Sequence, residues 1–215
     1  LSKTHSDLPE VYTALGDALR REEKYEEAVE AYTIALSKVP ELTAAQWPLL
    51  FTRGIAFERS DQWDSAEADF RHALELQPGQ PQVLNYMGYS FLEMNDNLDE
   101  AMSMIRAAVA ARPNDGYITD SLAWGLYRLR AYESAVAPME KATSLLPVDP
   151  ILNDHLGDVY WAVGRTREAR FQWNRSLSFD PEEKDAERIR QKLSIGLDRV
   201  LIEEGLEPTR APSDG

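Results

Sequence analysis

The chain has 215 residues, no cysteine and a formal net charge of −14 at neutral pH. The missing cysteine excludes disulfides, thiolate catalysis and cysteine-ligated zinc. The acidity argues against nucleic acid or anionic lipid as ligands, since both bind clustered Lys and Arg. No apolar run approaches the roughly 18 residues that span a membrane, so we expect no membrane insertion.

One residue pattern returns five times along the chain. In its first copy, Ala28 follows Gly16 by 12 residues and Pro40 follows Ala28 by another 12, with Tyr32 and Ala35 in between. The later copies fall on Gly54, Ala66, Phe70, Ala73 and Pro78; on Gly88, Ala101, Ile105, Ala108 and Pro113; on Ala123, Ala135, Met139, Ala142 and Pro147; and on Gly157, Ala169, Trp173, Ser176 and Pro181. A pattern that repeats with a period between about 20 and 50 residues indicates stacked structural units rather than one closed globule.

The pattern divides the chain into a lead-in and five repeats. The lead-in is 1–8, and the repeats are predicted at 9–42, 47–80, 81–115, 116–149 and 150–183. Each repeat is expected to form two helices; in the first helix, Val11, Leu15 and Leu19 share one face at helical spacing. The proline near the end of each repeat stops the second helix because it lacks the amide donor.

The small residues of the pattern have a packing role. Gly16 and Ala28 are expected where the two helices of a pair cross, because larger side chains would hold the helices apart. Tyr32 and its counterparts are expected to fill the core between layers. Arg53 stands where the first repeat has Leu15, which predicts looser packing in the second repeat.

The C-terminal segment differs from the repeats. Residues 181–204 are predicted as one capping helix with a capping-box-like start at Asp180 and Glu183. One face would cover the last repeat while the other meets water, as a terminal cap requires. The apolar face consists of Ile189, Leu193, Leu197, Val200 and Leu201. Residues 205–215 contain Gly, Pro, Ser and Asp and are expected to be disordered.

The pattern resembles that of the tetratricopeptide repeat (TPR) family, which has Leu-Gly, Ala, an aromatic, Ala and Pro at a period of about 34 residues. The resemblance covers residues 9–183. It implies an all-α fold, namely a right-handed α-solenoid of five antiparallel helix pairs with a C-terminal capping helix, whose concave face binds peptides or proteins. Repeats four and five also resemble the C-terminal part of bacterial TPR proteins, through 120–128 and 153–161. Several such proteins belong to the envelope or periplasm, which slightly favours that location over the cytoplasm.

The resemblance also implies which side chains face the concave surface, namely those at the fifth, ninth and twelfth positions of each repeat. These are Thr13, Asp17 and Arg20; Phe51, Ile55 and Glu58; Asn85, Tyr89 and Leu92; Asp120, Trp124 and Tyr127; and Asp154, Asp158 and Trp161. Some TPR domains hold a peptide's C-terminal carboxylate with Lys and Asn at the first two of these positions in repeat one. Thr13 and Asp17 stand there in this chain, so that basic clamp is not expected.

The groove is instead predicted to be acidic and aromatic. The candidate binding residues are Phe51, Asn85, Tyr89, Asp120, Trp124, Tyr127, Asp154, Asp158 and Trp161. The aromatic side chains would anchor a partner and the aspartates would favour Lys or Arg in that partner. We therefore expect an apolar, basic segment of a partner, extended or helical, in repeats three to five. The alternative is that the aromatics pack between neighbouring first helices and the aspartates form a solvated face.

No catalytic site is predicted. The histidines His5, His72 and His155 lie far apart in the repeat pattern, and no nucleotide, nucleophile or metal motif occurs. His155 with Asp158 gives too few ligands for a metal, so no metal and no cofactor are expected. Four arginines of repeat five are interpreted as ordinary surface charge: Arg165, Arg167, Arg170 and Arg175.

The leading functional hypothesis is a non-enzymatic scaffold that binds a partner protein or peptide. The first alternative is a docking or assembly module of a larger bacterial envelope protein or enzyme. A self-associating array is the second, because no cap is visible before Pro9 and an uncapped first repeat can stack on another copy, giving a homo-oligomer through the N-terminal repeat.

Overall fold

The computed structural model describes residues 8–210, and within that range all regular structure is helical. The predicted lead-in other than Leu8, and residues 211–215 of the predicted disordered tail, lie outside the described residues. The chain divides into two compact units, residues 1–87 and residues 88–215, called unit 1 and unit 2 below. The boundary falls inside helix α5 (Pro81–Met94).

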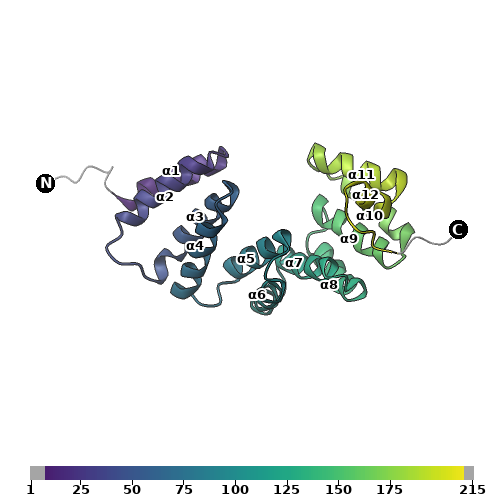
Figure 1. Cartoon of the computed structure of the whole chain (residues 1–215), viewed down its shortest axis with the longest axis horizontal. Helices are drawn as coiled ribbons and strands as arrows, with labels where there is room; N and C mark the ends of the chain where they lie inside the picture. Colours follow the sequence, from purple (N-terminus) through teal and green to yellow (C-terminus); the bar gives the residue numbers. More distant parts are fainter. Residues whose placement is uncertain (1–7, 211–215) are drawn as a thin grey trace. The chain divides into compact units, whose positions relative to one another are not determined.

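The helices follow one another in pairs within each unit (Figure 1). Unit 1 contains α1 (Pro9–Arg21), α2 (Tyr25–Ser37), a short 3-10 helix (Ala44–Gln46), α3 (Trp47–Arg59), α4 (Trp63–Leu76) and the start of α5. Unit 2 contains the rest of α5, then α6 (Leu98–Ala111), α7 (Gly116–Arg128), α8 (Tyr132–Leu145), α9 (Pro150–Ala162), α10 (Thr166–Leu177), α11 (Glu183–Ile195) and α12 (Leu197–Glu203). Helix α1 packs on α2, α3 on α4, α7 on α8 and α9 on α10. The predicted all-α solenoid is confirmed.

The paired helices approach closely where the sequence places glycine. A Cβ on Gly16 would lie 2.5 Å from the ring of Tyr32, and a Cβ on Gly157 would collide with the indole of Trp173. Both rings are fully buried, so they fill the space that the glycines leave. The predicted role of these small residues at the helix crossings is confirmed.

Arg53 does not loosen the second repeat, contrary to the prediction. Its Nε donates to Oδ2 of Asp69 at 2.7 Å, and its Nη2 donates to Oδ1 of the same carboxylate at 2.7 Å. Asp69 is buried on α4, so this two-pronged ion pair ties α3 to α4 where the first repeat has the apolar Leu15. The charged pair thus links the two helices at a position where Leu15 of the first repeat is 48% exposed.

The predicted single capping helix is wrong, because a break at Gly196 divides it into α11 and α12. Gly196 has φ +86°, a backbone conformation that favours glycine, and a Cβ there would lie 2.7 Å from the ring of Trp161. The capping role itself is present: Ile189, Leu197 and Val200 are buried in the core of unit 2. The capping-box-like start is also absent, since α11 begins at Glu183 and receives no side-chain cap hydrogen bond.

The tail beyond α12 is ordered over residues 205–210, contrary to the prediction of disorder. Thr209 donates both its backbone N–H and its hydroxyl to Asp198, at 2.7 and 2.6 Å. Glu207 accepts a hydrogen bond from Arg130 at 2.7 Å. No helix among residues 8–210 has both the length and the apolar character that crossing a membrane requires.

Candidate protein-binding groove

Unit 2 contains a cavity of about 250 Å³, called the groove pocket below. Its lining side chains come from α7, α9, α10 and α11, together with Pro181 just before α11. They are Trp124, Pro150, Ile151, Asp154, His155, Asp158, Ser176, Pro181, Asp185, Arg188 and Ile189. Three of the predicted binding residues, Trp124, Asp154 and Asp158, therefore lie on one cavity.

Trp124 forms a rigid aromatic wall of the groove pocket. Its ring stacks on His155 with centroids 4.0 Å apart and on Tyr127 with centroids 4.8 Å apart. Its indole N–H donates to Glu93 at 3.2 Å, so the ring is held at its edge as well as on its faces. Ile151 stands on the same pocket and is 51% exposed, which leaves an accessible apolar surface beside the fixed indole.

His155 is paired with the predicted groove residue Asp120. Its Nδ1 lies 3.0 Å from Oδ1 of Asp120, and both side chains are largely buried. Burial opposes the imidazolium, but the charge and hydrogen bond of Asp120 outweigh it and raise the pKa of His155. Asp120 is thus committed to a contact between neighbouring first helices. Across residues 8–210 no cluster of His, Asp and Glu is arranged to hold a metal ion.

Lys192 of α11 occupies the two aspartates of α9. Its ammonium lies 2.8 Å from a carboxylate oxygen of Asp154 and 2.8 Å from both oxygens of Asp158, and its side chain is fully buried. The indole N–H of Trp173 also donates to Asp158 at 2.9 Å. Burial raises the pKa of Asp158, although the Lys192 ammonium favours the carboxylate. The expectations of a free acidic groove and of a solvated acidic face are therefore both wrong at Asp158.

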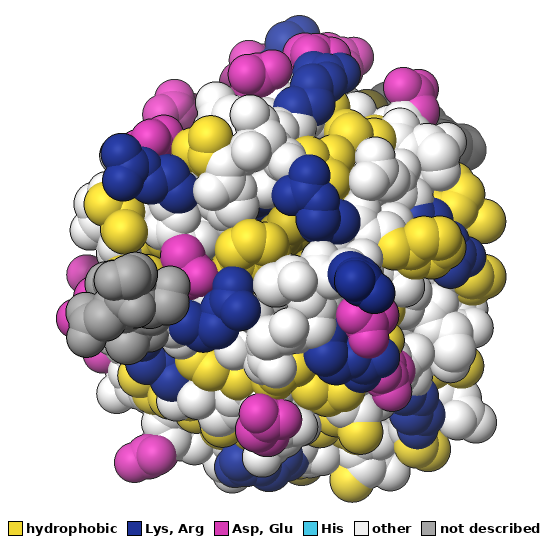
Figure 2. Space-filling model, turned by 90° about the vertical axis from the view of Figure 1, so that its right-hand side faces the viewer, with side chains coloured by type: hydrophobic (Ala, Val, Ile, Leu, Met, Phe, Trp, Pro, Cys, Tyr) yellow, Lys and Arg dark blue, Asp and Glu magenta, His cyan; other side chains and the backbone are white. Residues whose placement is uncertain are grey.

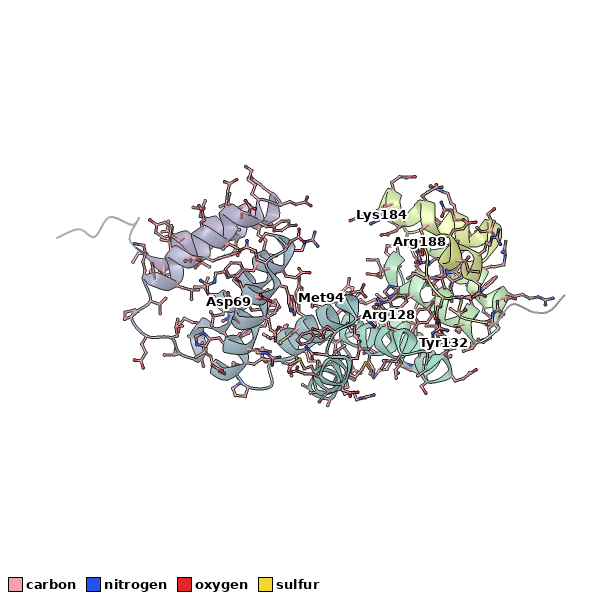
Figure 3. The ribbon with its side chains drawn as sticks, in the orientation of Figure 1. Asp69, Met94, Arg128, Tyr132, Lys184 and Arg188 are labelled. Atoms are coloured by element: carbon pink, nitrogen blue, oxygen red, sulfur yellow. The ribbon has the colours of Figure 1, made fainter. Side chains whose placement is uncertain are left out.

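Arg188 and Asp185 form the polar rim of the groove pocket. Arg188 lies on α11 (Figure 3). It donates to Glu204 at 2.7 Å and places Nη1 3.8 Å from Asp158. About a third of the Arg188 side chain stays accessible, and Asp185 is half-buried one turn before it. The rim thus offers one cation and one carboxylate to a ligand.

The other aromatic candidates of unit 2 are committed to packing or covered. Tyr127 is 8% exposed and packs between Trp124 and Tyr132. Trp161 donates its indole N–H to Asp198 at 2.7 Å, and the guanidinium of Arg210 covers its ring at 4.7 Å. Tyr89 of α5 is half-buried, and burial raises the pKa of its phenol.

The remaining candidates, Phe51 and Asn85, belong to unit 1 and are not on the groove pocket. Phe51 packs against Phe70 and Tyr86, with ring centroids 5.9 and 5.7 Å apart. Asn85 has a buried side-chain oxygen without a hydrogen-bond partner. For Phe51, the interpretation as packing between helices agrees with these contacts.

Two arginines of repeat five, Arg165 and Arg170, have partners within unit 2. Figure 2 looks at the C-terminal end of unit 2, where Lys and Arg side chains alternate with Asp and Glu and with apolar patches. Arg165 pairs with Glu140 and Glu168, and Arg170 donates to the backbone carbonyl of Leu193. These contacts agree with the interpretation as ordinary surface charge.

One sequence pattern would have predicted the hydrogen bond between Asp158 and Trp173. Asp17 and Asp158 occupy the ninth position of their repeats, and each accepts a hydrogen bond from the aromatic residue of the same repeat, Tyr32 at 2.7 Å and Trp173 at 2.9 Å. Repeat two has Ile55 at that position, and its aromatic residue is Phe70, which has no donor. An aspartate at the ninth position together with Tyr or Trp in the second helix therefore indicates an internal hydrogen bond.

Comparison with protein families gives two matches, both to models described as tetratricopeptide repeat, over residues 11–44 and 51–116. A curated relative, TPR repeat-containing protein PA4667 of Pseudomonas aeruginosa, is 29% identical over 162 residues. The match covers 74% of this chain and 27% of that protein, so the chain spans about a quarter of its relative's length.

Solved structures of several repeat proteins share the fold. Pseudomonas aeruginosa pilF superposes with a TM-score of 0.72 at 18% identity, covering 86% of this chain and 82% of that one. TTC0263, a TPR protein of Thermus thermophilus, gives a TM-score of 0.69 at 18% identity, over 87% of this chain and 98% of that one. A chain of the Cut9–Hcn1 hetero-tetramer of APC/C gives 0.74 at 16% identity, over 88% and 36%. At these identities the likeness shows the fold alone.

Proposed function

Because the chain is a tetratricopeptide repeat protein, we propose that it is a non-enzymatic scaffold that binds a partner protein through the groove pocket of unit 2. The observation that carries this proposal is the combination of a preformed cavity with a fixed indole wall, Trp124, and an accessible apolar side chain, Ile151. Binding sites of this kind are concave, mainly apolar and supplied with a few placed polar groups.

The shape and charge of the groove pocket favour an apolar anchor flanked by a basic residue. A cavity of about 250 Å³ accommodates a large side chain of a partner. More carboxylates than basic groups lie in and next to the groove pocket. The carboxylates are those of Asp120, Asp154, Asp158, Asp185 and Glu204, and the basic side chains are Lys192, Arg188 and His155. Since the buried carboxylates already have internal partners, Asp185 on the rim is the group we propose for a basic residue of the partner.

The pairing of the polar groups supports a binding role rather than catalysis. His155 is bound to Asp120, and Lys192 to Asp154 and Asp158, so these titratable groups stabilise one another. A general base needs an accessible proton acceptor within hydrogen-bond reach of its substrate. The buried pairs do not offer one.

The test uses a displayed library of random peptides and a matched pair of variants. Ile151→Glu places a charge on the groove pocket, whereas Phe171→Glu places the same charge on α10 at a side chain that is 63% exposed and does not line the pocket. We expect the unaltered chain and Phe171→Glu to enrich peptides with an apolar residue beside Lys or Arg, and Ile151→Glu to lose them. Equal enrichment by both variants would contradict the proposal.

The length of the curated relative supports the role of a docking or assembly module within a larger protein. The match covers 27% of that relative, which therefore has a large part of its length outside the matched region. Repeats four and five resemble the C-terminal part of bacterial TPR proteins, several of which belong to the envelope or periplasm, and this resemblance slightly favours that location. Fractionation of cells that produce the tagged full-length protein tests this, and recovery in the cytoplasm alone would contradict it.

A second candidate function is self-association through α1. Along one face of this helix and just before it, Leu8, Val11 and Leu15 are 42%, 42% and 48% exposed. These side chains recur at helical spacing and form an apolar stripe. Light scattering over a concentration series tests the idea: a mass that rises with concentration and falls on Leu15→Glu supports it, and a constant monomer mass overturns it.

A further inference from the structure

The chain's own tail, residues 207–210, is held by three side chains of unit 2. Asp198 at the start of α12 accepts from Thr209, Trp161 of α9 lies under the guanidinium of Arg210, and Arg130 after α7 contacts Glu207. We call Asp198, Trp161 and Arg130 the tail site. It shares no residue with the groove pocket.

Asp198 binds the Thr209 part of the tail through hydrogen bonds. One oxygen of Asp198 accepts both the N–H of Thr209, at 2.7 Å, and its hydroxyl, at 2.6 Å. The other oxygen accepts the indole N–H of Trp161 at 2.7 Å, which fixes the carboxylate. These hydrogen bonds lower the pKa of Asp198, although burial opposes its charge, so the acceptor is ionised at neutral pH.

The residues on either side of Thr209 also contact side chains of the tail site. The guanidinium of Arg210 stacks at 4.7 Å over the Trp161 ring, a cation–π contact. Arg130 donates to the backbone carbonyl of Pro208 at 3.1 Å and to the carboxylate of Glu207 at 2.7 Å. The site therefore contacts an acidic, a hydroxyl and an arginine side chain in that order. It also contacts one backbone carbonyl, of Pro208, and two backbone N–H groups, of Thr209 and Arg210.

The tail contributes almost nothing to the core. None of residues 205–210 is buried, Leu206 is 56% exposed, and the Glu207 side chain is 85% exposed. By contrast, Ile189, Leu197 and Val200 of α11 and α12 are at most 1% exposed. The tail leaves α12 through Gly205, whose φ is +77° and around which no atom restricts a Cβ. Detaching the tail would break polar contacts at the surface and leave the core intact.

From these contacts we propose that the tail site is a second peptide-binding site, for an extended partner segment of the order acidic residue, any residue, hydroxyl residue, Arg. The chain's own tail is its resident occupant and competes with that segment. An occupant tethered by a short linker has an effective concentration in the millimolar range, so a partner of the same chemistry binds weakly until the tail is released.

The test measures binding of a fluorescent peptide with the sequence of residues 205–210 to the full chain. The double variant Thr209→Ala/Arg210→Ala removes the hydroxyl and guanidinium contacts of the chain's own tail and leaves the side chains of the tail site unchanged. The backbone N–H at position 209 and the contacts of Arg130 remain. We expect this variant to bind the peptide at least tenfold more tightly than the unaltered chain does. Adding Asp198→Asn to the double variant should reverse the gain. Equal affinity of the unaltered chain and the double variant would overturn the proposal, as would equal affinity with and without Asp198→Asn.

Matched peptides and a measurement on the unaltered chain complete the test. A peptide with Thr209→Ala should bind the double variant at least tenfold more weakly, whereas one with Leu206→Ala should bind equally, because Leu206 is exposed. In the unaltered chain, excess peptide should displace the tail and shift the NMR signals of the chain's own Thr209 and Arg210 amides, which then leave Asp198. Unchanged signals at millimolar peptide would overturn the proposal. The groove pocket variant Ile151→Glu should leave this binding unchanged, which separates the outcome from that of the proposed function.

Discussion

Replacing Lys192 with methionine removes a fully buried ammonium that lies 2.8 Å from both Asp154 and Asp158. Methionine preserves most of the apolar stem, so the change isolates the charge. Breaking a buried ion pair by removing one partner costs about 3–5 kcal/mol, because the other charge stays buried without compensation. Asp158 is 2% exposed but keeps the hydrogen bond from Trp173 and the more distant Arg188. We therefore expect a loss near the lower end, about 3 kcal/mol.

The assay is urea unfolding at neutral pH, followed by far-UV circular dichroism and by tryptophan fluorescence, because stacked repeats can unfold in separate steps. Lys184→Met is the matched control, since Lys184 is on the same helix and exposed (Figure 3). The double variant Lys192→Met/Asp158→Asn should regain most of the lost stability, because no unpaired charge is then left on Asp158. A Lys192→Met variant within about 1 kcal/mol of the Lys184→Met control would refute the reasoning.

Two further predictions concern His155 and Gly16. Asp120 raises the pKa of His155 above 6.5, so this contact stabilises the folded state fully below pH 6.5 and loses its effect as the pH rises through the raised pKa. An NMR titration should show the raised pKa, and Asp120→Asn should abolish it and cost more stability in acid than in base; an unchanged titration would contradict this. Gly16→Ala places a methyl group 2.5 Å from Tyr32 and should cost about 1–3 kcal/mol in urea unfolding, whereas a neutral effect would show that the helices separate freely.

The sequence allowed the helix pairs to be predicted because their determinants are local and repeated. Glycine recurs opposite an aromatic ring, as Gly16 does opposite Tyr32 and Gly157 opposite Trp173, and the close approach of two helices requires that combination. Because the pattern occurs in five copies, a departure from it at one position does not change the predicted fold. The Arg53 substitution illustrates this, since Asp69 supplies a partner and the crossing is kept.

The burial and the hydrogen-bond partners of the candidate binding residues could not be predicted from the sequence. They depend on contacts between segments that are far apart in the chain. Lys192 meets Asp158 from 34 positions away, and Asp198 meets Trp161 from 37 positions away. The position of Lys192 beside Ile189 and Leu193 within the apolar stripe was a usable sign that its charge would need a buried partner. Without the fold, nothing in the sequence identified that partner as the pair of aspartates expected to receive a ligand.

The break at Gly196 and the ordered tail have a similar origin. A glycine near the end of a predicted helix is compatible with a helix that continues or with one that ends there. Here the helix ends at Gly196, where the Trp161 ring occupies the place of a Cβ. The tail composition is typical of disorder, but Asp198 supplies a carboxylate that binds Thr209. Both outcomes depend on residues far away in the sequence.

Photo-crosslinking from the groove pocket shows directly whether a bound peptide lies in that pocket. A benzophenone amino acid is placed at position 151 on the pocket or, as a control, at the exposed position 171 of α10, and the purified protein is exposed to a peptide selected by the display experiment. We expect crosslinks from position 151 to the apolar residue of the peptide and none from position 171. Crosslinks from position 171 alone would contradict it.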